Sequence, residues 1–379
     1  MKKIAFVIES LNLGGAETSL ITLLNSLDFD EYEVDLILFS TENFFINYVP
    51  VQVAIKFIEL PSLSLFDRLR FKLFRTFNLK NLHNAQILWP IISRKLNVNS
   101  AKYDYIHAYN QGFATYYVGI FMTAIVKNAW INIDYQSAGY DINFDIPFYS
   151  SFKRIITISD AVDIGFRQEL DGINRSVETE IIKLFTDEKL LKKRSQEYKP
   201  NELVDNTISI VTVCRLTEQK GLHLAIQSCR KLIDLGYKLN WYVVGEGRLR
   251  VDLEKEISKL GLKGHFHLLG IRENPFPYMA ACDIYVQTSL FEGWGLTLIE
   301  AVLLKKRVVT TNFPTAYNIV DDGYTGLIAE MSASDLTNKI FSILDNVDVQ
   351  HKLDNGLENR ANVDKAESMA IFNRLHIQN

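Results

Sequence analysis

Short apolar runs alternate with helical patterns along the chain, and this alternation occurs twice. It begins with KIAFVI at 3–8, followed by a run at 16–27 whose leucines recur at helical spacing. Further β-branched runs stand at 32–39, 104–109, 129–135 and 154–159. Such a strand and helix order predicts an α/β domain with a parallel sheet covered by helices on both faces.

The pattern restarts after a polar, charged stretch at 191–206. Strand patterns then stand at 207–216, 239–245, 265–270, 282–289 and 307–311, separated by helical runs. We therefore predict a Rossmann-like domain at 1–185, a linker at 186–206 and a second Rossmann-like domain at 207–365. A C-terminal helix at 366–379 could return to the first domain. Two such domains facing each other across a cleft would bind a ligand at the carboxyl ends of the strands.

Composition limits the class of partner. A chain of 379 residues, 47% hydrophobic, with a net charge of -4 predicts a globular protein without a general attraction to nucleic acid. The three cysteines, Cys214, Cys229 and Cys282, lack metal-ligand spacing and suit a reducing compartment. The apolar run at 4–8 is too short for a signal-peptide core, so we expect a cytoplasmic protein.

The stretch LFEGWGLTLIEAV at 290–302 lies between a strand pattern and a helical run. Its glycines, Gly293 and Gly295, would let a ligand approach the backbone and leave amide groups exposed at a helix N-terminus. Glu292 and Glu300 could then contact separate parts of one extended ligand. The alternative is that Glu292 caps the helix and Glu300 lies on the surface.

Three other loops follow strands in the same way. Arg215 and Lys220 stand on either side of a strand-to-helix connection, where two cations could converge on a diphosphate. Gly14 and Gly15 separate the first strand from the first helix, and backbone could approach phosphate there. The strand end at 270–272, before NPFPYM, could read a flat base with its backbone groups.

The order of GGAE, R-x4-K, NPFPYM and E-x7-E resembles that in retaining glycosyltransferases of family 4, which have the GT-B fold of two facing Rossmann-like domains. The N-terminal wording, including AYNQGFATYYVG and WINIDY, looks like the bacterial branch that builds capsule, exopolysaccharide or wall glycans. The resemblance implies transfer of a hexose or N-acetylhexosamine from a nucleoside diphosphate sugar, with UDP preferred, to a glycan or lipid-linked saccharide. It also implies retained anomeric configuration, no metal and no separate cofactor.

The resemblance assigns roles to particular residues. The implied catalytic residues are Arg215 and Lys220, which would hold the diphosphate, and Glu292, which would grip the transferred sugar. The implied nucleotide-sugar contacts are Gly15, Ile271, Arg272, Gly293, Trp294, Gly295, Leu296 and Glu300, with Glu300 on the ribose hydroxyls. The implied acceptor-side residues are Tyr109, Asn110, Asp134 and His107.

Two departures bear on these roles. Cys214 stands where many relatives carry glycine, and His107 with Tyr109 replaces the H-x-H strand end of many members. His107 could therefore be only a strand residue, and Asp134 could be a loop cap. Asp28-x-Asp30 looks like the metal-binding motif of the other glycosyltransferase fold, but it precedes the second strand and is read as a solvated turn.

Other classes of function remain open. A catalytically silent GT-B subunit would bind glycan or a partner transferase, and a GT-B epimerase would use the same sugar nucleotides without an acceptor. A two-carboxylate glycosidase would use Glu292 and Glu300 but leaves Arg215 and Lys220 without a role. A Rossmann oxidoreductase is disfavoured because no G-x-G-x-x-G follows the first strand.

A basic and aromatic segment at 66–95 predicts peripheral contact with an anionic membrane, where a lipid-linked acceptor would be found. The alternative is a helix pair with its aromatics in the core of the first domain. The segment's basic residues, counted from 62 to 97, are Arg68, Arg70, Lys72, Arg75, Lys80, Arg94 and Lys95, against one acid, Asp67.

Overall fold

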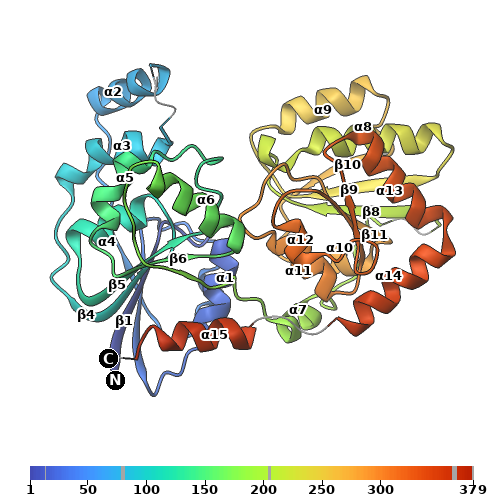
Figure 1. The fold of residues 1–379 in the computed structure, drawn as a ribbon. Helices are drawn as coiled ribbons and strands as arrows, with labels where there is room; N and C mark the ends of the chain where they lie inside the picture. The colour runs from blue at the N-terminus through green and yellow to red at the C-terminus, as the bar shows by residue number, and fades with distance from the viewer. Residues whose placement is uncertain (13, 78–81, 204–205, 361–364, 378–379) are drawn as a thin grey trace. The chain divides into compact units, whose positions relative to one another are not determined.

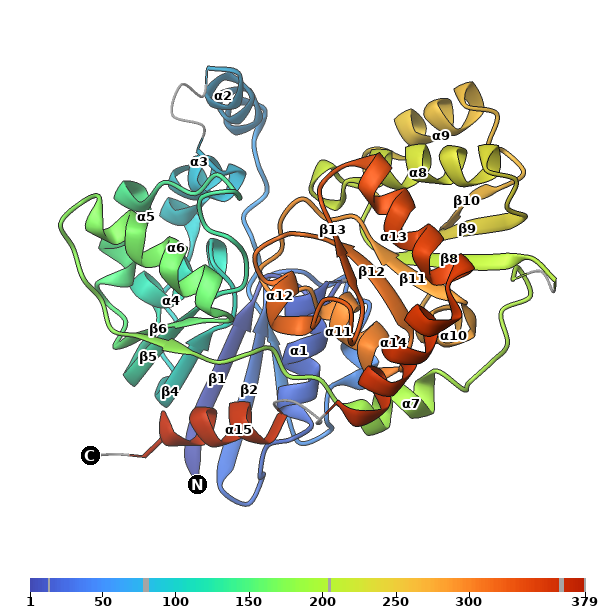
Figure 2. The same cartoon turned by 45° about the vertical axis from the view of Figure 1, so that its right-hand side comes forward.

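The computed structural model describes residues 1–12, 14–77, 82–203, 206–360 and 365–377. The chain divides into two compact units, the first formed by 1–186 together with 364–379 and the second by 187–363. Each unit is built on one parallel sheet, and Figures 1 and 2 show both sheets flanked by helices. The predicted α/β architecture of two Rossmann-like domains is confirmed.

The sheet of the first unit has seven strands in the order β3-β2-β1-β4-β5-β6-β7, and all its pairings are parallel. The strands are β1 (Lys2–Ile8), β2 (Tyr32–Leu38), β3 (Ala54–Phe57), β4 (Lys102–Ala108), β5 (Thr123–Ile131), β6 (Arg154–Thr157) and β7 (Thr179–Ile181). The sequence did not indicate β3 and β7. Both are short and contain no buried residue, so they lack the apolar run that marks the central strands.

The helices of the first unit follow the strands as a doubly wound fold requires. They are α1 (Gly15–Leu24), α2 (Leu65–Thr76), α3 (Asn84–Ile92), α4 (Phe113–Phe121), α5 (Ile142–Tyr149), α6 (Asp160–Asp171) and α15 (Lys365–Arg374), with 3-10 turns η1 (Ile46–Tyr48) and η2 (Ser93–Lys95).

The C-terminal helix α15 belongs to the first unit, far in sequence from the rest of it. Phe372 is fully buried, with its ring stacked 6.1 Å from that of Phe6 in β1. Just beyond the helix, the carbonyl of His376 accepts hydrogen bonds from Lys2 Nζ at 2.8 Å and Tyr105 Oη at 2.9 Å. Figures 1 and 2 accordingly show α15 beside β1.

The sheet of the second unit has six parallel strands in the order β10-β9-β8-β11-β12-β13. The strands are β8 (Ile208–Val213), β9 (Leu239–Val244), β10 (Phe266–Gly270), β11 (Ile284–Gln287), β12 (Arg307–Thr311) and β13 (Leu327–Ala329). Alternate residues face opposite sides, so Ile210 joins one buried apolar cluster and Val211 the other.

The helices of the second unit form those two layers. They are α7 (Glu188–Arg194), η3 (Glu218–Lys220), α8 (Leu222–Asp234), α9 (Arg250–Lys259), α10 (Phe276–Ala281), α11 (Leu296–Leu303), α12 (Ala316–Ile319), α13 (Ala333–Asp345) and α14 (Val347–Asn359). The stretch expected to be a linker contains α7, whose Leu191 is buried in the second unit. In the part of the chain that the structure describes, no helix is both long and apolar enough to traverse a bilayer.

Candidate functional site

The loop after β8 and the loop after β11 are tied together, although about 70 residues separate them. Gly221 has φ of +58°, and a Cβ atom there would lie 2.1 Å from the carbonyl oxygen of Thr288. The hydroxyl of Thr288 in turn donates to the carbonyl of Lys220 at 2.8 Å. Only glycine permits this approach. The contact brings Lys220 to the segment that carries Glu292.

Lys220 and Glu292 form an ion pair of 2.5 Å between Nζ and Oε1. The same carboxylate oxygen also accepts hydrogen bonds from Ser289 Oγ at 2.6 Å and Gln287 Nε2 at 3.2 Å. The two charged side chains are only 14% and 10% exposed. Glu292 is therefore a fixed member of a polar cluster and not a helix cap, since α11 is preceded by Gly295 and has no side-chain cap.

The second oxygen of Glu292, Oε2, accepts no hydrogen bond from the residues that the structure describes. Two further cationic and polar groups surround the pair. Arg215 is exposed just after β8. Burial raises the pKa of the Cys214 thiol to about 12, and the charges of Lys220, Glu292 and Arg215 all act on it. The four groups therefore lie close together at the carboxyl end of β8.

Helix α11 begins at this cluster. Gly295, with φ of +81°, precedes its first residue, Leu296, and leaves the first amide groups of the helix without a side-chain cap. Trp294 and Leu296 are buried. The predicted loop and helix therefore have the expected form, with Gly293 to Leu296 following Glu292 directly.

Glu300 lies inside α11 and is 6% exposed. Its carboxylate makes no hydrogen bond to any of the described residues. Burial raises its pKa to about 8, opposed by the positive charge of Arg194. A buried carboxylate without a hydrogen-bond donor is costly, so this group is suited to receive donors from a ligand. The surface position that was the alternative for Glu300 is wrong.

The strand end at 270–272 is held by the side chain of Arg272. Arg272 donates to the carbonyl of Leu269 at 2.7 Å, to Tyr278 Oη at 3.0 Å and to Glu202 Oε1 at 2.9 Å. Its guanidinium therefore fixes the loop to α10. Ile271 is half exposed, and its carbonyl accepts a hydrogen bond from Arg272 at 3.2 Å.

In the first unit, Gly15 is the first residue of α1, and Gly14 precedes it with no side-chain cap. A Cβ atom at Gly14 would lie 2.2 Å from a carboxylate oxygen of Glu17. The glycine pair therefore leaves room for Glu17 over the start of the helix.

Sequence reasoning missed Glu9, which follows β1 directly. Its two carboxylate oxygens accept hydrogen bonds from Ala114 N and Asn110 Nδ2, both at 3.2 Å. Burial raises the pKa of Glu9, against the effect of these donors. The signal in the sequence was its position as the first polar residue after an apolar strand. Asn110 and Glu9 thus form one polar cluster at the carboxyl ends of β1 and β4.

His107 and Tyr109 are both fully buried. His107 Nδ1 accepts from Trp130 Nε1 at 3.1 Å, so its Nε2 carries the proton and donates to His376 Nε2 at 2.9 Å. Burial lowers the pKa of His107 well below its usual value, which keeps the ring neutral. The hydroxyl of Tyr109 lies 3.2 Å from Ser19 Oγ. These side chains pack in the core of the first domain, where His107 contacts Phe372 of α15 and His376. They are therefore not part of the acceptor site proposed below.

Asp134 accepts hydrogen bonds from the backbone and hydroxyl of Ser137, at 3.0 and 2.9 Å. It therefore caps a turn after β5, the alternative that the sequence left open, and it remains partly exposed.

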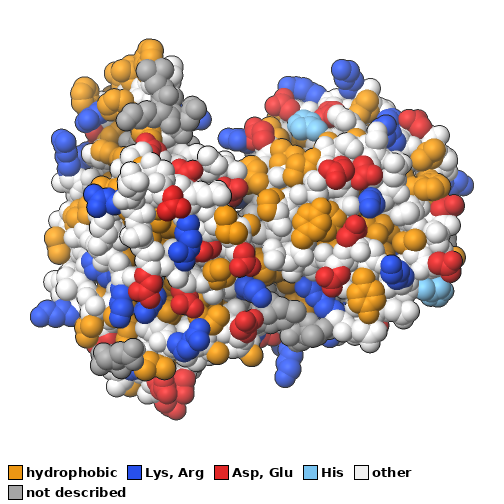
Figure 3. Space-filling model, viewed as in Figure 1, with side chains coloured by type: hydrophobic (Ala, Val, Ile, Leu, Met, Phe, Trp, Pro, Cys, Tyr) orange, Lys and Arg blue, Asp and Glu red, His pale blue; other side chains and the backbone are white. Residues whose placement is uncertain are grey.

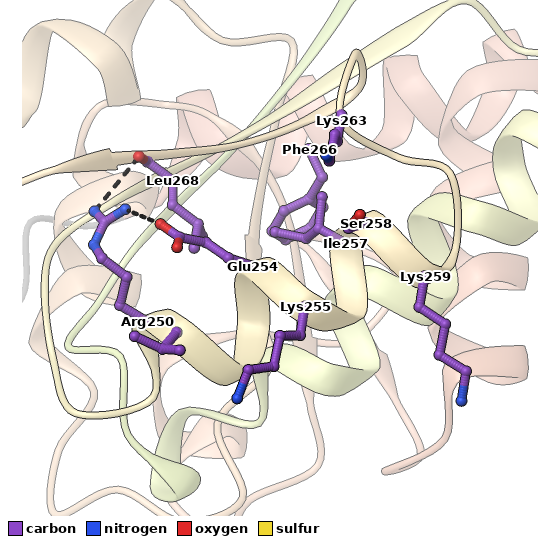
Figure 4. A pocket seen from close by; sticks show the side chains of 10 residues that line it. Arg250, Glu254, Lys255, Ile257, Ser258, Lys259, Lys263, Phe266 and Leu268 are labelled. Carbon is purple, nitrogen blue, oxygen red and sulfur yellow. Dashed lines mark hydrogen bonds and ion pairs between the residues drawn. The ribbon is translucent and has the colours of Figure 1, made fainter.

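A shallow depression lies elsewhere, between α9 and the edge strand β10 (Figure 4). Three lysines, Lys255, Lys259 and Lys263, stand at its rim, and Arg250 bridges Glu254 at 3.0 Å and the carbonyl of Leu268 at 3.5 Å. None of the expected site residues lines it.

Comparison with known proteins shows what the second unit is similar to. Residues 193–360 match the family model of glycosyl transferases group 1. Over 153 residues the chain is 32% identical to the Campylobacter jejuni N-acetylgalactosamine-N,N'-diacetylbacillosaminyl-diphospho-undecaprenol 4-alpha-N-acetylgalactosaminyltransferase, covering 40% of each chain. Over 142 residues it is 30% identical to the capsular polysaccharide biosynthesis glycosyltransferase CapM of Staphylococcus aureus, covering 37% of each. The matches thus span less than half the length of these curated relatives.

The whole chain resembles a solved structure. HepE of Anabaena in complex with UDP and glucose superposes with a TM-score of 0.76 over 99% of each chain, at 19% identity. The fold is that of the GT-B glycosyltransferases, as predicted from the sequence.

Proposed function

We propose that the chain is a retaining glycosyltransferase that moves a hexose or N-acetylhexosamine from a UDP-sugar to a glycan or lipid-linked saccharide during synthesis of a cell-surface polysaccharide. The observations that carry the proposal are the cluster of Arg215, Lys220 and Glu292 at the carboxyl ends of β8 and β11, and the buried Glu300 in α11, the helix that follows β11. It supplies cations for a diphosphate and carboxylates for hydroxyl groups. A glycosidase pair would have no use for the cations.

Arg215 and Lys220 are proposed to bind the diphosphate. As the bond between the sugar and the diphosphate breaks, negative charge develops on the leaving phosphate, and fixed cations stabilise it most in a partly buried site. Ser289 and Gln287 fix the Glu292 carboxylate, and its Oε1 holds the Lys220 side chain in place beforehand, which removes the need to order it during the reaction. These cations would make a metal ion unnecessary, so we propose metal-independent catalysis.

The open oxygen of Glu292 is proposed to accept a hydrogen bond from a hydroxyl of the transferred sugar, together with the backbone amides of 293–296. Glu300 is proposed to accept hydrogen bonds from the two ribose hydroxyls. Backbone groups of Ile271 and Arg272 are proposed to contact the base. We assign no protein nucleophile, because an oxygen of the departing phosphate can take the proton of the acceptor hydroxyl.

The first domain is proposed to bind the acceptor. Asn110 and Glu9 are the polar groups at the ends of its central strands, and Asp134 is a partly exposed carboxylate in the turn after β5. Either acceptor class presents hydroxyl groups that these side chains can bind. Two similar proteins support this choice of substrates. The name of the Campylobacter relative includes diphospho-undecaprenol, which supports a lipid-linked acceptor, and the structure of HepE contains UDP, which supports a UDP-sugar donor. A cytoplasmic enzyme at the inner face of the membrane would meet both.

A measurement of UDP release with and without acceptor tests the proposal. A glycosyltransferase releases UDP mainly when acceptor is present, and Lys220→Ala should remove that release while Lys255→Ala, on the outer side of α9, retains it. Release that is equal without acceptor would favour a sugar-nucleotide epimerase. No release and no nucleotide binding would favour a silent subunit.

A further inference from the structure

Helix α2 presents an apolar face to solvent. None of its 12 residues, all of which the structure describes, is buried. Leu65, Phe66, Leu69 and Leu73 are 84%, 72%, 59% and 55% exposed. Residues four apart share one face of a helix, so the three leucines form one stripe with Phe66 beside it. A row of large apolar side chains exposed together indicates a binding surface.

The opposite side of α2 is attached to the rest of the first domain. Asp67 and Phe71, also four residues apart, are half-buried, and Lys95 Nζ bridges Asp67 Oδ2 at 2.8 Å from the 3-10 turn that follows α3. Ser64 caps the helix through Asp67 in a reciprocal pair of hydrogen bonds. The orientation of α2 is therefore fixed from one side, and its leucine stripe faces outward. Figures 1 and 2 show α2 at the end of the domain beyond α3, and Figure 3 shows hydrophobic side chains over it.

Basic residues flank the stripe. Arg68, Lys72 and Arg75, spaced by four and three residues, form a neighbouring row, and Arg70 lies on the other flank. The helix has four basic residues against the single acid Asp67, which Lys95 already pairs. A leucine stripe between cations is the pattern of helices that lie in the surface of an anionic membrane.

The structure also narrows the predicted membrane segment of 66–95. Helix α3 buries Ile87, Trp89, Ile91 and Ile92. Trp89, the aromatic residue in the second half of this segment, therefore belongs to the core of the first domain. Lys80 lies outside the described residues. The surface that remains is α2 itself.

We propose that α2 lies in the surface of an anionic membrane, with Leu65, Leu69, Leu73 and Phe66 inserted and Arg68, Lys72 and Arg75 at the lipid headgroups. At about 1.5 Å of rise per residue, 12 residues reach about 18 Å and cannot cross a hydrocarbon layer of about 30 Å, so the helix lies flat. A second copy of the chain is the less suitable occupant, because a symmetric contact through α2 brings its cationic rows together.

The position of α2 in the sheet order connects it to the proposed acceptor site. It follows β3, and the carboxyl ends of parallel strands lie at one edge of the sheet, where Glu9 and Asn110 also stand. The start of α3 lies at this edge too, since Ala85 Cβ is 3.3 Å from the place that a Cβ atom at Gly112 would occupy, with Glu9 Oε1 at 3.6 Å. A membrane at α2 would thus bring a lipid-linked saccharide to this edge. That choice of acceptor rests on the proposed function, whereas the membrane contact does not.

Sedimentation with lipid vesicles tests the contact without nucleotide or acceptor. The native chain should bind vesicles of phosphatidylcholine mixed with phosphatidylglycerol, bind phosphatidylcholine alone far less, and release as salt is raised. The triple variant Arg68→Gln, Lys72→Gln, Arg75→Gln should bind about a hundredfold more weakly, from about 1 kcal/mol per cation. Leu69→Gln with Leu73→Gln, which leaves the charge unchanged, should lose at least about tenfold. Unchanged thermal unfolding would show that these variants are folded, since they alter no buried residue.

The matched control is Lys255→Gln, Lys259→Gln, Lys263→Gln, which removes the same charge from the second domain and should bind vesicles as the native chain does. The proposal would be overturned if this control bound vesicles as weakly as the triple arginine and lysine variant. It would also be overturned if the leucine variant bound them like the native chain, or if the native chain did not bind anionic vesicles. So would a dimer in sedimentation velocity that the leucine variant dissociates, since α2 would then be occupied by a second copy.

Discussion

Replacement of Glu300 by glutamine separates the stability of the second domain from the nucleotide binding proposed for it. The carboxyl is buried and lacks a hydrogen-bond donor among the described residues, so ionisation costs free energy in the folded state. Its pKa rises from 4.5 to about 8. Glutamine has nearly the same shape and never ionises.

The direction in which stability changes with pH follows from the linkage between protonation and folding. Because the folded pKa lies above the unfolded one, the stabilising effect of the protonated form is complete below pH 4.5 and is lost as pH rises through about 8. One pKa unit corresponds to about 1.36 kcal/mol. Compared with a carboxyl whose pKa does not change on folding, the raised pKa of Glu300 should therefore lower the free energy of unfolding of the native chain by about 3 kcal/mol at pH 7 and about 5 kcal/mol at pH 9. Glu300→Gln escapes this loss. The stability difference between variant and native chain should therefore grow with pH.

Urea unfolding followed by circular dichroism at pH 5, 7 and 9 measures that difference. UDP binding, measured by calorimetry, should weaken at least tenfold in the same variant, because the two hydrogen bonds proposed from the ribose to a charged acceptor would be replaced by bonds to a neutral amide. Glu59→Gln, at an exposed position of the first domain, is the control and should change neither quantity. A Glu300→Gln protein that gains no stability between pH 5 and 9, or binds UDP as the native chain does, would refute this account of Glu300.

Three further predictions concern other parts of the chain. UDP affinity of the native chain should rise with pH up to about 8, because the proposed ribose contact uses the ionised form of Glu300. Calorimetry in buffers of different ionisation enthalpy should detect release of a proton, and an affinity that does not change with pH would contradict the prediction. Gly221→Ala should destabilise the second domain by more than about 2 kcal/mol and weaken nucleotide binding, since its Cβ atom would lie 2.1 Å from the Thr288 carbonyl; Gly264→Ala, where no atom lies within 4 Å, should be neutral in thermal unfolding. Phe372→Ala should cost the first domain about 3 kcal/mol, because the ring is fully buried against Phe6; an unchanged melting temperature would mean that α15 is not docked there.

The alternation of strands and helices was readable from the sequence because central strands are continuous apolar runs. The edge strands β3 and β7 have no such run, and α7 lies in a polar stretch whose few apolar residues include the buried Leu191. The two edge strands and α7 form through tertiary contacts, which a local sequence pattern does not contain.

The candidate site was predicted in part for a similar reason. Arg215, Lys220, Glu292 and Glu300 could be placed on strand-end loops and one helix start from spacing alone. The ion pair between Lys220 and Glu292 could not be predicted from the sequence, because it depends on the close approach of Gly221 to Thr288. His107 and Tyr109 lie at a strand end as expected, but both are buried instead of facing an acceptor, and His107 is covered by a histidine 269 residues away, in the C-terminal segment.

A calorimetric titration of UDP, GDP and ADP into the native chain and into Lys220→Ala, with Lys255→Ala as the control, would show whether the proposed site binds the nucleotide. The site of Arg215, Lys220, Glu292 and Glu300 predicts that UDP binds the native chain and the control with equal affinity, and binds Lys220→Ala at least about a hundredfold more weakly. Binding of UDP by Lys220→Ala with native affinity, or binding of none of the three nucleotides by the native chain, would contradict it.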